Sequence, residues 1–192
     1  TLGSFANARH PKELINHNGV THILNTSNEE LSMLFRDYDE TPKILTSNNS
    51  QGKDLRRALS GPTVTGNKAG SFNFTNLGAI EMKHLACVDD DMNPDKIKRG
   101  IRAAVNWIET TRKENPSARI MVCDVLGVRS AAAVCIAYLM MKQKFSLISA
   151  FTHVRMHRNH IQPPHEIFKA LCSLEMELFP GTVITIFIKT NQ

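Results

Sequence analysis

The sequence predicts an α/β domain in which a central, mostly parallel sheet is flanked by helices. Short segments of strand composition alternate along the chain with longer segments that have the apolar spacing of amphipathic helices. The segment 119–123 is short and largely apolar, as strands buried on both faces of a parallel sheet are. A glycine-containing turn and a helical segment follow it at once, and this succession is typical of α/β domains.

Each predicted helix opens at a Pro, Ser or Asn, the residues that commonly cap or start helices. We expect helices at residues 11–16, 29–36, 94–114, 130–143, 146–157 and 163–178. We expect strands at residues 21–25, 71–74, 81–88 and 119–123. The apolar stripe of the helix at 94–114 consists of Ile97, Ile101, Ala104, Val105 and Ile108. The predicted apolar face of the helix at 130–143 consists of Val134, Ala137, Tyr138 and Met141.

The chain has 192 residues, and we expect a single domain over 1–192 with a sizeable core. The segment at about 39–78 is poor in apolar residues and rich in turn formers, which predicts a long mobile insertion. Residues 183–188, within a C-terminal tail at 179–192, have strand composition. We expect this tail to add an edge strand or to contact another chain.

Composition excludes several classes of function. The formal net charge is +5, but no base-reading motif or aromatic platform accompanies the basic residues, so we expect no nucleic-acid partner. No apolar run approaches the roughly 20 residues that cross a bilayer, and no signal peptide opens the chain, so we expect no membrane partner. The four cysteines show no Cys-x2-Cys pairing. They indicate a reducing compartment, and we expect a cytoplasmic protein with no metal or other cofactor.

The segment 119–141 carries the functional argument, because it is predicted to form a strand, a tight loop and a helix. Backbone N–H groups in the first turn of a helix have no partners within the helix, so a loop before them can hold a phosphate without help from a side chain. The sequence therefore predicts an anion-binding loop between residues 123 and 130.

This stretch resembles the signature of the dual-specificity branch of the protein tyrosine phosphatases, which reads His-Cys-x-x-Gly-x-x-Arg-Ser ahead of a helix. Ile120-Met121-Val122 match its strand, Gly127 its loop glycine and Ala137-Tyr138-Leu139-Met140 its helix. The resemblance also covers residues 2–27 and 80–178 outside the loop. It implies the phosphatase fold, a Cys nucleophile and an Arg that clamps the phosphoryl group.

Aligned without a gap, the loop lacks both of these residues. Cys123 then stands at the family's His, Asp124 replaces the nucleophilic Cys and Ser130 replaces the Arg. The degenerate phosphate loop consists of Cys123, Asp124, Val125, Leu126, Gly127, Val128, Arg129 and Ser130. A carboxylate would repel a phosphate dianion, and an alcohol cannot replace the bidentate guanidinium. We expect Asp124 to accept the N–H groups of the loop and so to fill the anion site from within.

Aligned one residue earlier, the loop keeps the two residues that the chemistry needs. Cys123 and Arg129 have the Cys-x5-Arg spacing of a nucleophile and a clamp. This alignment costs an insertion in the helix and turns that helix by about 100°. Asp91, which follows the strand predicted at 81–88, would then be the general acid.

The gapless alignment predicts a pseudophosphatase, a non-catalytic domain that acts in phospho-signalling by binding a protein such as a phosphoprotein or a kinase. The alternative is an active protein phosphatase that uses Cys123 and Arg129, and a third possibility is phosphate recognition without turnover through Arg129 or Arg158. The family has Asn after Pro before its last helix, where it braces the loop, but this chain has Pro163-Pro164. We therefore expect the loop to lack that brace.

Overall fold

The computed structural model describes residues 1–8, 18–29, 44–46, 72–74, 80–87 and 93–181. The described strands are β1 (Leu2–Ser4), β2 (His22–Asn25), β3 (Ile44–Thr46), β4 (Phe72–Phe74), β5 (Glu81–His84) and β6 (Ile120–Asp124). The described helices are α1 (Phe5–Ala8), α4 (Pro94–Glu114), α5 (Ser130–Gln143), α6 (Leu147–His157) and α7 (His165–Leu178).

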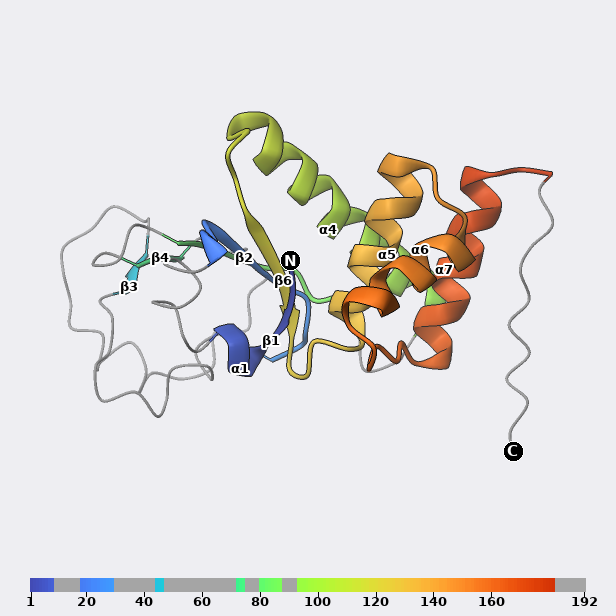
Figure 1. Cartoon of the computed structure of the whole chain (residues 1–192), viewed down its shortest axis with the longest axis horizontal. Coiled ribbons are helices and arrows are strands. Elements are labelled where there is room, and N and C mark those ends of the chain that lie inside the picture. Colours follow the sequence, from blue (N-terminus) through green and yellow to red (C-terminus); the bar gives the residue numbers. More distant parts are fainter. Residues whose placement is uncertain (9–17, 30–43, 47–71, 75–79, 88–92, 182–192) are drawn as a thin grey trace.

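The strands form one sheet in the order β1-β6-β2-β5-β4-β3. The pairs β1/β6, β6/β2 and β2/β5 are parallel, whereas β4 pairs antiparallel with both β5 and β3. Figure 1 shows α4, α5, α6 and α7 gathered to one side of this sheet, with α1 beside β1. The predicted α/β fold, with a mostly parallel central sheet flanked by helices, is confirmed.

Helix α5 is the centre of the domain. It contacts α4, α6 and α7 as well as β6 and β1, so nearly every side of it is covered. Its predicted apolar face was partly wrong: Val134 and Ala137 are buried, but Tyr138 is only partly covered, while Ile136 and Met140 are fully buried. A helix surrounded by other elements has no single apolar face, so its periodicity did not identify its contacts. The stripe predicted for α4 is buried throughout.

Element boundaries agree with the sequence where capping residues mark them. Helices α4 and α5 have the predicted bounds, and Asn93 caps α4 with its side chain. The other two begin slightly later, because Ser146 and Pro164 are the N-caps of α6 and α7. The helices predicted at 11–16 and 29–36 lie outside the described residues except for Glu29.

Strand prediction was less accurate. The strand predicted at 81–88 ends at His84, although the backbone N–H groups of Leu85 and Cys87 still donate to the carbonyl oxygens of Asn25, the last residue of β2, and of Thr26. The short strands β1 and β3 were not predicted, since three residues carry too little periodicity. Strands β3 and β4 lie within the segment predicted as an insertion at 39–78, and most of that segment, like 182–192, lies outside the described residues.

Candidate phosphate-loop site

The parallel sheet brings the site residues to the carboxyl end of β6. In the register of the sheet, Cys123 pairs with Gly3 of β1 and with Asn25 of β2, and Asp124 pairs with Ser4. Successive side chains of a strand point to opposite faces, so Cys123 and Asp124 diverge. The chain then turns through residues 125–129 and enters α5 at Ser130. Ligand sites in α/β sheets commonly lie at this end of the strands.

Gly127 gives the loop its shape. Its φ of 68° lies in the left-handed region, and a Cβ at this position would collide with the carbonyl oxygen of Gly3. Only glycine fits both the backbone conformation and the close contact with β1. The position that the sequence identified as the family's loop glycine is therefore required by geometry.

The carboxylate of Asp124 lies at the centre of the loop and is only 3% exposed. Its Oδ1 accepts the backbone N–H groups of Leu126 at 3.0 Å and Gly127 at 2.5 Å. Its Oδ2 accepts those of Arg129 at 3.1 Å and Ala131 at 2.9 Å. Four donors that could face a phosphate are thus bonded to a side chain of the same chain. The expectation that Asp124 accepts the N–H groups of the loop agrees with this geometry.

Ser130 is the other residue that replaces a family residue in the gapless alignment. Its side chain is 3% exposed, and its hydroxyl lies 2.9 Å from that of Thr26 and 3.4 Å from Oδ2 of Asp124. The Thr26 hydroxyl also donates to the carbonyl oxygen of Cys123 at 3.1 Å. Thr26 was not predicted as a site residue, and its position directly after the apolar strand β2 was the available indication. The three side chains form a buried polar cluster beneath the loop.

The two residues of the alternative alignment are placed far less favourably for joint chemistry. Cys123 is 0% exposed, and burial, with the charge of Asp124 as a smaller cause, raises the pKa of its thiol to about 12. Arg129 has an exposed side chain, while its backbone N–H is bonded to Asp124. The third residue, Asp91, lies outside the described residues.

The rim of the loop is apolar and braced. Val125 is 40% exposed and Leu126 is 60% exposed. Nη2 of Arg158 donates to the carbonyl oxygen of Leu126 at 2.9 Å, and the backbone N–H of Gln162 donates to the carbonyl oxygen of Val128, also at 2.9 Å. The loop lacks the Asn brace of the family, as expected, but two residues after α6 hold it in another way. Neither bond involves position 164, where this chain has Pro in place of the family's Asn.

No group of three or more potential metal ligands occurs among the residues that the structure describes. Within the same residues, no helix combines the length and the apolar character needed to cross a membrane. All four cysteines are unpaired thiols.

Comparison with known proteins agrees with this architecture. The family model of the dual specificity phosphatase catalytic domain matches residues 62–177. Dual specificity protein phosphatase 5 of Rattus norvegicus is 27% identical over 93 residues, and that of Homo sapiens is 25% identical over the same length. Each match covers 48% of this chain but only 24% of the relative, so the chain spans about a quarter of these proteins.

Solved structures share the fold at low sequence identity. Human DUSP28 has a TM-score of 0.57 at 18% identity, covering 92% of this chain and 88% of its own. The human tyrosine phosphatase-like serine/threonine/tyrosine-interacting protein has a TM-score of 0.57 at 20% identity, with 92% and 90% covered. The family model matches more than half of this chain. We conclude that the chain belongs to the dual specificity phosphatase catalytic-domain family.

Proposed function

We propose that this chain is a pseudophosphatase, a non-catalytic domain that acts in phospho-signalling by binding a protein. The observation that carries the proposal is the carboxylate of Asp124, which accepts four backbone N–H groups of the loop. Those donors are the groups that would stabilise a bound phosphoryl group at the start of a helix. In this chain they stabilise a residue of the protein instead.

Electrostatics support the same conclusion. A phosphate dianion entering the loop would meet the buried negative charge of Asp124. Two like unit charges roughly 4 Å apart repel by about 4 kcal/mol at an effective dielectric constant of about 20, and a dianion doubles that. The loop would also have to release its existing hydrogen bonds before it could bind a new anion. Substrate binding in this loop is therefore strongly disfavoured.

In the gapless alignment, the loop centre also has neither the nucleophile nor the clamp of the family. Ser130, at the clamp position of the gapless alignment, bonds to Thr26 and cannot supply two parallel N–H donors. Catalysis by Cys123 would need its thiolate, but burial raises its pKa to about 12, so the reactive form is scarce at neutral pH. These features favour the pseudophosphatase over the alternative of an active phosphatase that uses Cys123 and Arg129.

The test is hydrolysis of an aryl phosphate by the purified domain. Wild type is compared with Cys123→Ser and with the double variant Asp124→Cys/Ser130→Arg, after each variant is shown to be folded by circular dichroism. We expect no turnover by wild type and measurable turnover by the double variant. Turnover by wild type that Cys123→Ser abolishes would show an active phosphatase and would refute the proposal.

The proposal also includes the kind of partner and the compartment. A domain that has lost catalysis can still use its surface, and we propose a protein partner, such as a phosphoprotein or a kinase, in the cytoplasm. Co-expression of the tagged domain with candidate kinases and fluorescence imaging of the full-length protein would test this part. Exclusively nuclear or organellar localisation would contradict it.

A further inference from the structure

The charge of this chain is concentrated in one segment. Residues 125–162, which include the loop after Asp124, α5 and α6, contain five Lys and Arg residues and no Asp or Glu. The remaining residues hold 18 Lys and Arg against 18 Asp and Glu, so the whole formal net charge of +5 lies in this segment. Where the cations of this segment face solvent without a neighbouring carboxylate, they create a positive surface.

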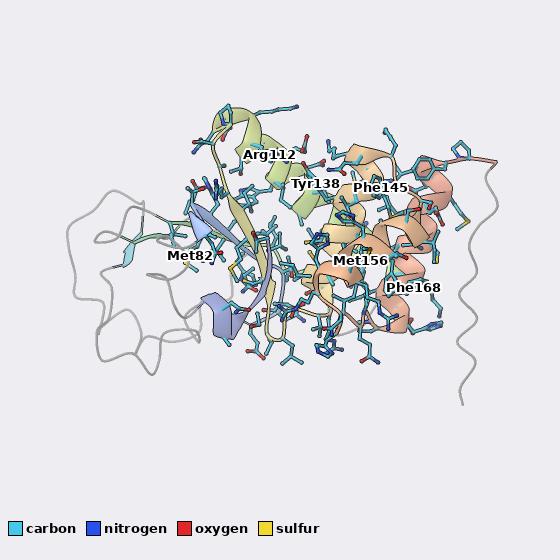
Figure 2. The ribbon with its side chains drawn as sticks, in the orientation of Figure 1. Met82, Arg112, Tyr138, Phe145, Met156 and Phe168 are labelled. Atoms are coloured by element: carbon cyan, nitrogen blue, oxygen red, sulfur yellow. The ribbon has the colours of Figure 1, made fainter. Side chains whose placement is uncertain are left out.

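The same segment also carries exposed apolar side chains. Large exposed hydrophobic residues in the described part of the chain are Val125, Leu126, Met156 and Met176, and the first three belong to it. Figure 2 shows Met156 on α6, in front of the helical layer. Val125 and Leu126 are adjacent on the rim of the loop. Apolar side chains that stay exposed next to a positive surface indicate an interaction site.

Loop and helix end form one surface because hydrogen bonds join them. Arg158, which follows α6, bonds to the carbonyl oxygen of Leu126, and Gln162 bonds to that of Val128. Figure 1 shows the C-terminal end of α6 beside the loop that joins β6 to α5. We define the loop face as Val125, Leu126, Arg129 and Arg158.

The cations of this face have not been neutralised by the ion pairs that the structure describes. Those ion pairs use other cations, namely Lys98, Arg102, Lys142 and Lys169, together with His22. The one carboxylate of the loop, Asp124, is buried and bonded to backbone N–H groups, so it is not presented to a ligand. A ligand at the loop face therefore meets guanidinium groups and aliphatic side chains.

We propose that the loop face docks an acidic segment of a protein partner, in which carboxylates alternate with aliphatic side chains. This inference rests on the proposed function, because it assigns the partner-binding surface of the pseudophosphatase. Carboxylates would pair with Arg129 and Arg158, and aliphatic side chains would cover Val125 and Leu126. Because Asp124 already fills the anion site, recognition does not require a phosphate on the partner.

Two other classes of ligand fit the observations less well. Single-stranded nucleic acid needs aromatic side chains on which bases stack, but the exposed large hydrophobic residues of the described part are aliphatic or Met. Stable attachment to a membrane needs a larger apolar insertion than two neighbouring residues on one loop. An acidic peptide matches both the charge and the size of this surface.

Selection from a displayed library of random peptides tests the inference directly. The bait is the wild-type domain, and the counter-selection uses the double variant Leu126→Gln/Arg129→Glu. Enriched peptides are then synthesised in three forms: as selected, with Asn and Gln in place of Asp and Glu, and with one added phosphoserine. Binding is measured by fluorescence polarisation at two salt concentrations.

We expect enriched peptides to combine carboxylates with Leu, Ile, Val or Met, and their amide forms to bind at least about tenfold more weakly. Leu126→Gln and Arg129→Glu should each weaken binding at least about threefold, whereas Arg99→Glu, the same charge change on α4, should not. The phosphoserine form should bind no more than about threefold better than the unmodified peptide, because the phosphate cannot enter the loop.

Several outcomes would overturn the inference. These are enrichment of non-acidic peptides, no enrichment over the counter-selection, equal loss with Arg99→Glu, or strong preference for the phosphoserine form. Tighter binding to phosphatidylserine vesicles, or self-association through the loop face in sedimentation, would assign the surface to a membrane or to a second copy. Aryl phosphate turnover would instead refute the proposed function and is measured separately, so the two failures are distinguishable.

Discussion

Helices α5 and α6 both begin at a buried carboxylate, but the two carboxylates are bonded very differently. At α5, both oxygens of Asp124 accept backbone N–H groups, and the N-cap residue contributes no side-chain bond. At α6, Oε1 of Glu175 accepts the N–H of Leu147 at 2.6 Å, while Oε2 has no hydrogen-bond partner among the described residues. Ser146 caps α6 independently with its own side chain. The start of α5 therefore depends on a negative charge, and the start of α6 does not.

Removing the carboxylate of Asp124 should have the largest effect. Asp124→Ala leaves four backbone donors without acceptors in a buried loop, so we expect a loss of about 4 kcal/mol in the free energy of unfolding. Urea denaturation measures this loss. An added oxyanion could replace the carboxylate, so inorganic phosphate should stabilise the variant but leave wild type unchanged.

Two results would contradict the difference between the two helix starts. The first is a loss for Asp124→Ala no larger than that for Asp95→Ala, which removes an exposed acidic residue from the first turn of α4. The second is equal stabilisation of wild type and variant by phosphate, which would mean that the anion binds elsewhere.

Gly127→Ala tests whether the start of α5 also depends on close contact with β1. The added Cβ would meet the carbonyl oxygen of Gly3 at a φ of 68°, so we expect a loss of about 3 kcal/mol from strain and displacement. Gly181→Ala is the matched control, because that φ is 84° but nothing lies within 4 Å of the new Cβ. Equal losses in urea denaturation for both variants would leave only the backbone conformation as the cause.

The sequence predicted the centre of this site better than its surroundings. The gapless alignment with the family signature placed Asp124 and Ser130 at the nucleophile and clamp positions of the loop, because the loop is a local motif of fixed length. Thr26 was missed because its contact with Ser130 spans 104 residues and depends on the pairing of β2 with β6. The brace by Arg158 was missed because it bonds a backbone carbonyl, which carries no residue-type information.

Prediction of the fold likewise succeeded where the signal is local in the sequence and failed where it depends on distant residues. The bounds of α4 follow from its cap and its periodicity, and the start of α5 was predicted at Ser130, all from local sequence. The contacts of α5 could not be predicted in this way, since Ile136 and Met140 are buried by other helices rather than by the sheet alone. The three-residue strand β1 is held by its pairing with β6, and no local pattern marks it.

Two isosteric changes, one at Glu175 and one at Asp124, each remove a charge without a change of side-chain volume. Glu175→Gln keeps an acceptor for the N–H of Leu147 and removes a buried charge, so we expect the free energy of unfolding to change by less than about 1 kcal/mol. Asp124→Asn should cost about 3 kcal/mol, because its amide nitrogen cannot accept from Arg129 or Ala131. Both values come from urea denaturation at neutral pH, and a larger loss for Glu175→Gln would contradict the difference between the two helix starts.

A third carboxylate, on the surface, should matter least. Glu177 of α7 is 45% exposed in its side chain and pairs with Lys98, at 2.7 Å, and with Arg102, both on α4. Because exposed ion pairs are weak, we expect Glu177→Gln to cost about 0.5 kcal/mol at low salt and less at high salt.

The same ion pairs predict how this contribution depends on pH. The hydrogen bond with Lys98 is the main cause that lowers the pKa of Glu177 from 4.5. A lowered folded pKa means that the contribution is present above the unfolded value and is lost as the pH falls through the folded one. The variant should therefore lose less stability than wild type between neutral pH and about pH 3. Glu114→Gln, at the exposed end of α4, is the control. A loss above about 2 kcal/mol for Glu177→Gln alone would show that the ion pairs between α4 and α7, rather than the loop around Asp124, hold the helices together.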